Sequence, residues 1–162
     1  MPLVISNTGP LLALIEIGQL EVLRLLFDAV VIPPAVRAEI LNEPAYEAIQ
    51  AALASGWIAE QSPGDLGAVR VLRNDLDAGE SEAIALAQET APTWIILDDL
   101  AARHLAGALG LPVIGTLGVL LKAKDAGHLS ALKPVLDQLR QSAFYISDPL
   151  YRQVLQSAGE AA

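Results

Sequence analysis

Short runs of apolar residues alternate along the chain with longer stretches in which apolar positions recur every three or four residues. The short runs have the length of buried strands, and the longer stretches have the spacing of helices. The expected strands are residues 3–6, 29–32, 57–60, 93–97 and 112–114. The expected helices are residues 11–17, 20–27, 34–42, 45–55, 77–90, 100–109, 116–126, 131–141 and 149–156. Because the strands are apolar throughout, the pattern predicts an α/β fold of three layers, with helices over both faces of a parallel sheet of four or five strands.

Residues at the ends of these stretches predict where the helices begin. Asp77 and Glu80 have the spacing of a capping box. Ser130 and Ser147 are expected N-caps of the last two helices. The first strand is followed at once by residues typical of a turn, namely Asn7, Gly9 and Pro10.

The chain has no linker, internal repeat or low-complexity tract. We therefore expect one domain over residues 1–157, followed by a C-terminal tail over 158–162. The most polar stretch is 61–76, where a short helix is expected around residues 69–72.

Composition narrows the possible chemistry. The chain is 53% hydrophobic and has no cysteine, which excludes disulfides, thiolate metal sites and cysteine nucleophiles. The two histidines, His104 and His128, are too few for a histidine-built zinc centre. The net charge of −9 gives no bulk attraction for nucleic acid. No targeting segment or membrane span is visible, so a cytoplasmic protein is expected.

Polar side chains follow three of the expected strands at the point where each strand ends. Asn7 follows the first strand, Asp98 and Asp99 follow the fourth, and Thr116 follows the fifth. Ligands of open parallel sheets bind beyond the carboxyl ends of the strands, so these side chains are candidates for a site. Each of them also has a simpler explanation as a helix cap.

Two glutamates on neighbouring helices extend this set. Glu39 borders the apolar stripe of its helix, and Glu82 lies one turn into the helix that begins near Asp77. A solvated helix face explains either one alone, and Glu80 is explained by the capping box. Converging carboxylates repel one another unless a proton is shared or a cation binds, and oxygen ligands favour Mg²⁺ or Mn²⁺. Such ions activate water and stabilise a leaving oxygen in phosphodiester hydrolysis.

Several segments resemble those of PIN domains. The similarity covers nearly the whole chain, about residues 1–157, and its ordered set of segments is more specific than any one of them. The segments that resemble the family are 4–14, 33–40, 79–87, 95–103 and 115–121.

This resemblance implies a small parallel α/β/α fold and an endoribonuclease that depends on Mg²⁺ or Mn²⁺. Many relatives are VapC-like toxins of toxin–antitoxin pairs, which are homodimers neutralised by a small antitoxin protein. The acids carried over are Glu39, Glu82 and either Asp98 or Asp99, as catalytic residues and metal ligands. The family's first aspartate falls where this chain has Asn7, as in a poorly characterised subgroup of the family. Asn7 then becomes a neutral metal ligand that cannot act as a base, and Thr116 is an expected cofactor-binding residue.

Alternatives to a nuclease remain open at this point. A PIN-like binding module with a decayed site would also carry Asn7, whereas a phosphate-accepting receiver domain would need acids just after the first strand. Arg103 or Lys122 is expected either to meet a phosphate or to be a surface charge. The apolar positions of 131–156 are expected either to cover the core or to form a groove for a second copy or an antitoxin helix.

Overall fold

The five apolar runs form five strands at the predicted places. They are β1 (Val4–Ser6), β2 (Val30–Ile32), β3 (Ile58–Glu60), β4 (Trp94–Ile96) and β5 (Val113–Ile114). The computed structural model describes residues 2–160, and Met1 and residues 161–162 of the expected tail lie outside this range. All neighbouring strands are parallel, which confirms the predicted sheet.

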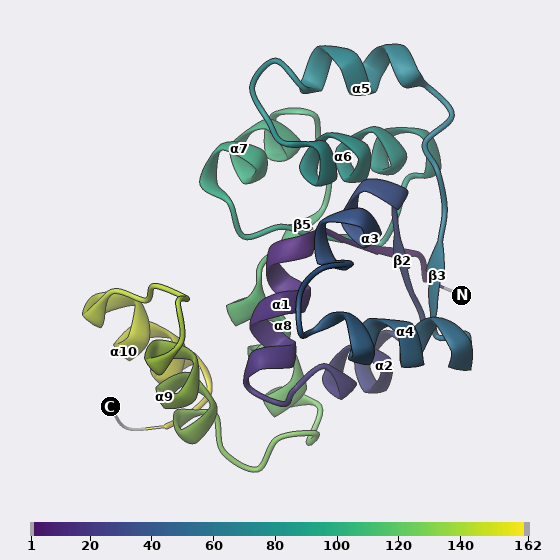
Figure 1. The fold of residues 1–162 in the computed structure, drawn as a ribbon. Helices are drawn as coiled ribbons and strands as arrows, with labels where there is room; N and C mark the ends of the chain where they lie inside the picture. Colours follow the sequence, from purple (N-terminus) through teal and green to yellow (C-terminus); the bar gives the residue numbers. More distant parts are fainter. Residues whose placement is uncertain (1, 161–162) are drawn as a thin grey trace.

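The strand order is β3-β2-β1-β4-β5, with β1 in the centre. Ile5 on β1 stands in register with Val31 on one side and Ile95 on the other. The chain therefore builds outward from β1 to β3, crosses back, and continues with β4 and β5 (Figure 1). The direction of building changes between β1 and β4, and in open α/β sheets this is where ligands bind.

Successive strand residues face opposite sides of the sheet, which divides the core in two. Val4 and Ile96 face one buried cluster, and Ile5, Ile95 and Leu97 face the other. The first cluster takes its helical residues mainly from α1 (Thr8–Glu16), α2 (Glu21–Phe27), α3 (Pro34–Ile40), α4 (Tyr46–Ser55) and α8 (Thr116–Asp125). The second takes them from α5 (Leu66–Leu72), α6 (Ala78–Thr90) and α7 (Leu100–Ala108), which lie together at the top of Figure 1. Helices on both faces confirm the three-layer prediction.

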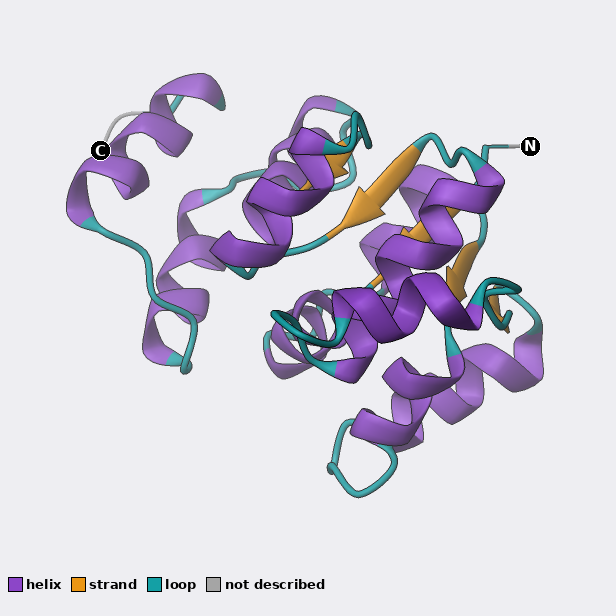
Figure 2. Ribbon diagram, turned by 90° about the horizontal axis from the view of Figure 1, so that it is seen from above, coloured by secondary structure: helices purple, strands orange, loops and turns teal. Residues whose placement is uncertain are grey.

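The last two helices, α9 (Lys133–Gln141) and α10 (Asp148–Ser157), lie at one side of the molecule (Figure 2). Their apolar positions are buried against the first cluster, including Leu136, Leu139 and Leu155, none of which is exposed. These positions cover the core, as one of the two sequence readings expected. Leu150 is 38% exposed and does not share this burial.

Two predicted caps are confirmed, whereas the helix starts predicted at residue 11 and after Ser130 are wrong. Asp77 and Glu80 form a complete capping box, and Ser147 caps α10. The helix expected from residue 11 begins at Thr8. Pro10 lies in its first turn, where proline is tolerated. Ser130 is not an N-cap.

A distant carboxylate takes the place of Ser130 at the start of α9. Glu160 accepts hydrogen bonds from the backbone N–H groups of Leu132 (2.6 Å) and Lys133 (3.1 Å). Its carboxylate also pairs with Lys124 on α8 at 2.8 Å. These contacts lower the pKa of Glu160 to about 2, with the hydrogen bond from Lys124 as the largest cause. The chain end thus fixes the C-terminal helices to the rest of the fold.

Within residues 2–160, none of the helices combines the length and the apolar character needed to cross a bilayer.

Candidate active site

The carboxyl ends of the neighbouring strands β1 and β4 lie at one edge of the sheet. Between these two strands the order in which the chain adds strands reverses. The backbone N–H of Asn7 donates to the carbonyl of Ile96 at 3.1 Å, which extends the strand pairing by one residue. Asn7 thereby starts α1 directly beside Asp98 and Asp99, which follow β4. The topology, rather than proximity in sequence, brings these side chains to one place.

A cavity of about 330 Å³ opens at this edge. It is bounded by the starts of α1, α6 and α7 together with α3. Six of its lining residues are acidic, namely Glu39, Glu43, Asp77, Glu80, Asp98 and Asp99. The remaining lining residues are Asn7, Thr8, Gly9, Pro10 and Leu12. Acidic side chains from three separate chain segments therefore share one cavity.

Glu39 connects two helix starts through its carboxylate. The Thr8 hydroxyl donates to its Oε1 at 2.5 Å, and the backbone N–H of Gly79 donates to its Oε2 at 3.1 Å. Gly79 has no room for a side chain, because a Cβ there would clash with Glu39 and stand 3.0 Å from Asn7 Oδ1. The carboxylate of Glu39 and the amide of Asn7 thus meet at the start of α6.

Asn7 is buried, with 5% of its surface exposed, and its Oδ1 has no hydrogen-bond partner. Within residues 2–160, the Ser81 hydroxyl is the other fully buried side-chain polar group that has no hydrogen-bond partner. A buried acceptor left without a partner costs about 1–3 kcal/mol. An unpaired amide oxygen that faces carboxylates suits a cation, which both kinds of oxygen attract.

Glu80 lines the cavity in addition to forming the capping box with Asp77. The N–H of Asp77 donates to Oε2 of Glu80 at 3.2 Å, so Oε1 takes no part in the cap. Burial raises the pKa of Glu80; the hydrogen bond from Asp77 opposes this shift, and the charges of Asp77, Asp99 and Glu39 add to it. Glu80 therefore faces the other acids.

Asp98 and Asp99 both line the cavity but have different hydrogen bonds. Asp98 accepts from the Thr116 backbone N–H (2.8 Å) and from the Thr116 hydroxyl (2.5 Å), which ties β4 to the start of α8. Asp99 caps α7 with Oδ2, which accepts from the Ala102 N–H at 3.0 Å, while its Oδ1 takes no part in the cap. Asp99 thus has one oxygen available for a ligand. Asp98 instead fixes the start of α8 beside the end of β4. Thr116 is fully buried and does not line the cavity.

Glu82 does not line the cavity. Its Oε1 accepts a hydrogen bond at 3.0 Å from the N–H of Ala35, in the first turn of α3. Residues two positions apart on a helix point about 200° apart, so Glu80 and Glu82 face different sides. Glu82 holds the start of the helix that carries Glu39, while Glu80 faces the cavity.

The other predicted charges do not line the cavity. Arg103 lies just beyond Asp98, and its Nη1 donates to the Leu97 carbonyl at 2.8 Å. Lys122 stands over the ring of Trp94, which begins β4 at the opposite end of the strand. His104 and His128 are exposed and lie outside the cavity lining.

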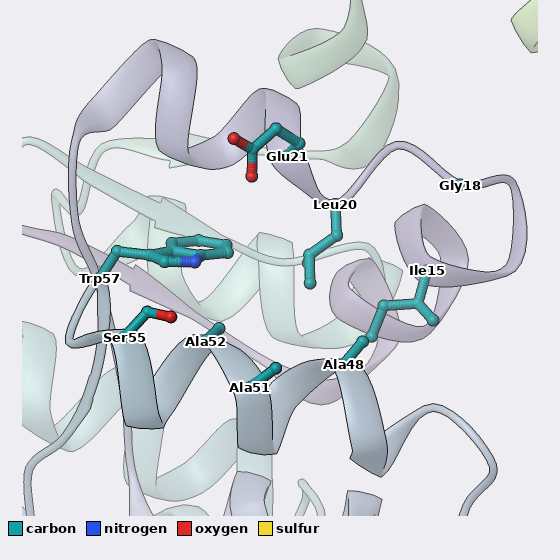
Figure 3. A pocket seen from close by; sticks show the side chains of 9 residues that line it. All are labelled: Ile15, Gly18, Leu20, Glu21, Ala48, Ala51, Ala52, Ser55 and Trp57. Atoms are coloured by element: carbon teal, nitrogen blue, oxygen red, sulfur yellow. The ribbon is translucent and has the colours of Figure 1, made fainter.

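A hollow of about 400 Å³ between α2 and α4 is mostly apolar (Figure 3). Its carboxylate, Glu21, is hydrogen-bonded to Arg24. The ring of Trp57 lies along its wall. This lining offers no set of reactive side chains.

The acidic cavity has the donor chemistry of a site for a hard divalent cation. Its donors are carboxylate and amide oxygens, which Mg²⁺ and Mn²⁺ prefer, and Asn7 Oδ1 has no other partner. Over residues 2–160, no three acidic or histidine side chains are close enough together to coordinate one ion as they stand. The chemistry of the residues therefore fits a metal, and binding would require side-chain adjustment.

Comparison with known proteins gives one family. Residues 3–160 match the family model DUF3368, which is described as a PIN domain. No curated protein matches the chain.

Proposed function

The chain belongs to the PIN-domain family, and from this premise we propose that it is an endoribonuclease that requires Mg²⁺ or Mn²⁺. Domains of this family are typically nucleases and generally use divalent metals. The observation that carries the proposal is the unpaired amide oxygen of Asn7 in a cavity lined by six acids. RNA as the substrate and Mn²⁺ or Mg²⁺ as the ion are the parts of the proposal that go beyond family membership.

In this proposal the metal is held by Asn7, Glu39, Glu80 and Asp99. When bound, the ion would lower the pKa of a water molecule and neutralise the phosphodiester. Asn7 contributes an oxygen without charge, so it orients the ligand sphere but does not remove a proton. Burial raises the pKa of Glu80, and a bound cation would oppose this shift. Asp98 fixes the start of α8 at the cavity edge through its hydrogen bond from Thr116.

The best test of this proposal is RNA cleavage with controlled metal. We expect an RNA with a fluorescent label to be cut in Mn²⁺ or Mg²⁺ and left intact in chelator. Asp99→Asn should reduce the rate by about 100-fold, which corresponds to about 3 kcal/mol of transition-state stabilisation. Glu47→Gln, on the exposed surface of α4, is the matched control for loss of one charge. Equal cleavage in chelator would refute the metal-dependent mechanism.

A role as the toxin of a toxin–antitoxin pair is the biological setting that we propose, because the chain resembles the PIN family and many members of that family are VapC-like toxins. The partners in this setting are a second copy of the chain, an antitoxin protein and cytoplasmic RNA. Induced expression should then arrest growth, and Asp99→Asn should relieve the arrest. Growth arrest that persists with this variant would show that toxicity does not depend on the acidic cavity.

The second candidate is a binding module whose nuclease site has decayed. It is favoured by the neutral Asn7 and by the spread of the acids, which do not already form a coordinating group over residues 2–160. Titration with Mn²⁺ separates the two candidates, because a decayed site gives no binding heat. Binding that is lost in Glu80→Gln and kept in Glu82→Gln would support the nuclease.

A further inference from the structure

A second cleft, of about 520 Å³, adjoins the acidic cavity. Asp98 lines both hollows, so the two lie on either side of this one residue. The cleft is bounded by α7, β5, α8, α10 and the segment before α10. A ligand chain that passed Asp98 would therefore reach both hollows.

The cleft has an aromatic and apolar lining that the fold does not bury. Tyr145 is 85% exposed and Leu100 is 72% exposed, and Phe144 lies half-buried beside them. The chain has only two phenylalanines, three tyrosines and two tryptophans. An aromatic ring left in solvent beside the cavity of such a chain is a feature that core packing does not explain.

The charged residues of the cleft balance one another, whereas those of the cavity next to it are all acidic. Its lining includes one cation, Arg103, and one acid, Asp98. Both oxygens of Asp98 already accept hydrogen bonds from Thr116. Arg103 is held at this boundary by the bond from its Nη1 to the Leu97 carbonyl, and a guanidinium has further N–H donors to offer.

We propose that this cleft binds a base of single-stranded RNA next to the phosphodiester that is cleaved, an inference that rests on the proposed nuclease function. The base stacks on Tyr145, and Arg103 donates to a phosphate on the same strand. A nucleotide joins an apolar ring to an anion within a few ångströms, and here the aromatic side chain and the cation share one lining. Because stacking does not read base edges, the subsite accepts different bases.

A second copy of the chain is the competing occupant of the same face. It would bury Tyr145, Leu100 and Leu150, but it would not use a cation placed beside the acidic cavity. The position of Arg103 therefore favours RNA, and the oligomeric state is measured alongside binding.

The test measures binding of a fluorescein-labelled oligouridylate by anisotropy in chelator, so that binding to the cleft is measured without metal in the cavity. Tyr145→Ala should weaken binding about tenfold, and Tyr145→Trp should restore it. Leu66→Ala, which changes an exposed apolar residue on α5, is the matched control and should bind as the unmodified protein does. In the cleavage assay, Tyr145→Ala should raise KM and leave kcat nearly unchanged.

The outcomes separate this inference from the function on which it rests. Binding that is unchanged in Tyr145→Ala, or absent altogether, overturns the subsite even if Mn²⁺-dependent cleavage is intact. Binding that depends on Tyr145 in a protein that cuts no RNA supports the subsite and refutes the nuclease. Light scattering that shows a dimer becoming a monomer in Tyr145→Ala, with RNA binding unchanged, assigns the face to a second copy instead.

Discussion

At the scale of the residue, Asn7 leaves the cavity with one negative charge fewer than an aspartate at this position would give it. It occupies the central position between β1 and β4, where the PIN family carries an aspartate according to the resemblance. Burial is the largest cause of the raised pKa of Glu80, and the nearby charges of Asp99 and Glu39 add to it, so these acids repel one another there. A neutral amide at position 7 reduces this repulsion and leaves a weaker attraction for a cation.

Asn7→Asp should therefore strengthen Mn²⁺ binding. A carboxylate about 4 Å from a cation contributes up to about 4 kcal/mol near a protein surface, so we expect at least a tenfold rise in affinity, about 1.4 kcal/mol. Calorimetric titration measures this change. An affinity that is unchanged or lower would show that position 7 does not contact the ion.

Gly79 is the second decisive residue, because no side chain fits between Glu39 and Asn7. Gly79→Ala should cost about 1–3 kcal/mol of unfolding free energy, since an added methyl group forces its neighbours to shift. It should also weaken Mn²⁺ binding. Gly107→Ala on α7, where a Cβ would meet nothing within 4 Å, is the matched control and should stabilise the protein slightly. Equal effects of the two changes, measured by urea unfolding, would contradict the close approach.

At the scale of the element, Glu82 and Glu80 divide two tasks on one helix. Glu82 stabilises the start of α3 through Ala35, and Glu80 faces the cavity. Glu82→Gln keeps the hydrogen bond but loses the charge near a helix N-terminus, so it should cost about 0.3–1 kcal/mol of stability and leave Mn²⁺ affinity unchanged. Glu80→Gln should lower Mn²⁺ affinity about tenfold or more. Calorimetry that shows the opposite order would exchange the two roles.

The C-terminal helices depend on Glu160 in a way that pH reveals. Its pKa falls from 4.5 to about 2 on folding, so the carboxylate contributes stability above pH 4.5 that is lost as the pH falls toward 2. Glu160→Gln should unfold at a lower temperature than the unmodified protein at pH 7, and the difference should shrink as the pH falls through this window. Glu47→Gln serves as the control. A difference that stays constant with pH would contradict the depressed pKa.

The choice between Glu80 and Glu82 shows where sequence reasoning stops at the scale of the element. Most of α6 is buried, including Gly79, Glu80, Ser81 and the apolar run after Glu82. A helix with no polar face gives no periodic signal of its rotation, so the pattern cannot say which acid faces the sheet edge. The capping box was the one usable signal, because it places Glu80 in the first turn, next to the strand ends.

At the scale of the whole molecule, strand positions and parallel pairing could be predicted because buried strands are short apolar runs. The meeting of Asn7 with Asp98 and Asp99 also followed, since parallel strands end at one edge. Glu160 at the start of α9 could not be predicted, because that contact joins residues far apart in sequence. The cleft beside Tyr145 is likewise a product of tertiary packing, which no local pattern records.

The whole chain carries a net charge of −9, so only a bound cation makes its acidic cavity suitable for an RNA phosphate. The most direct measurement is therefore a crystal structure with Mn²⁺, examined for anomalous density. We expect a peak in the cavity that contacts Asn7 Oδ1 and carboxylate oxygens of Glu39, Glu80 and Asp99. A cavity without such a peak at saturating Mn²⁺, in crystals that show Mn²⁺ bound elsewhere, would contradict it.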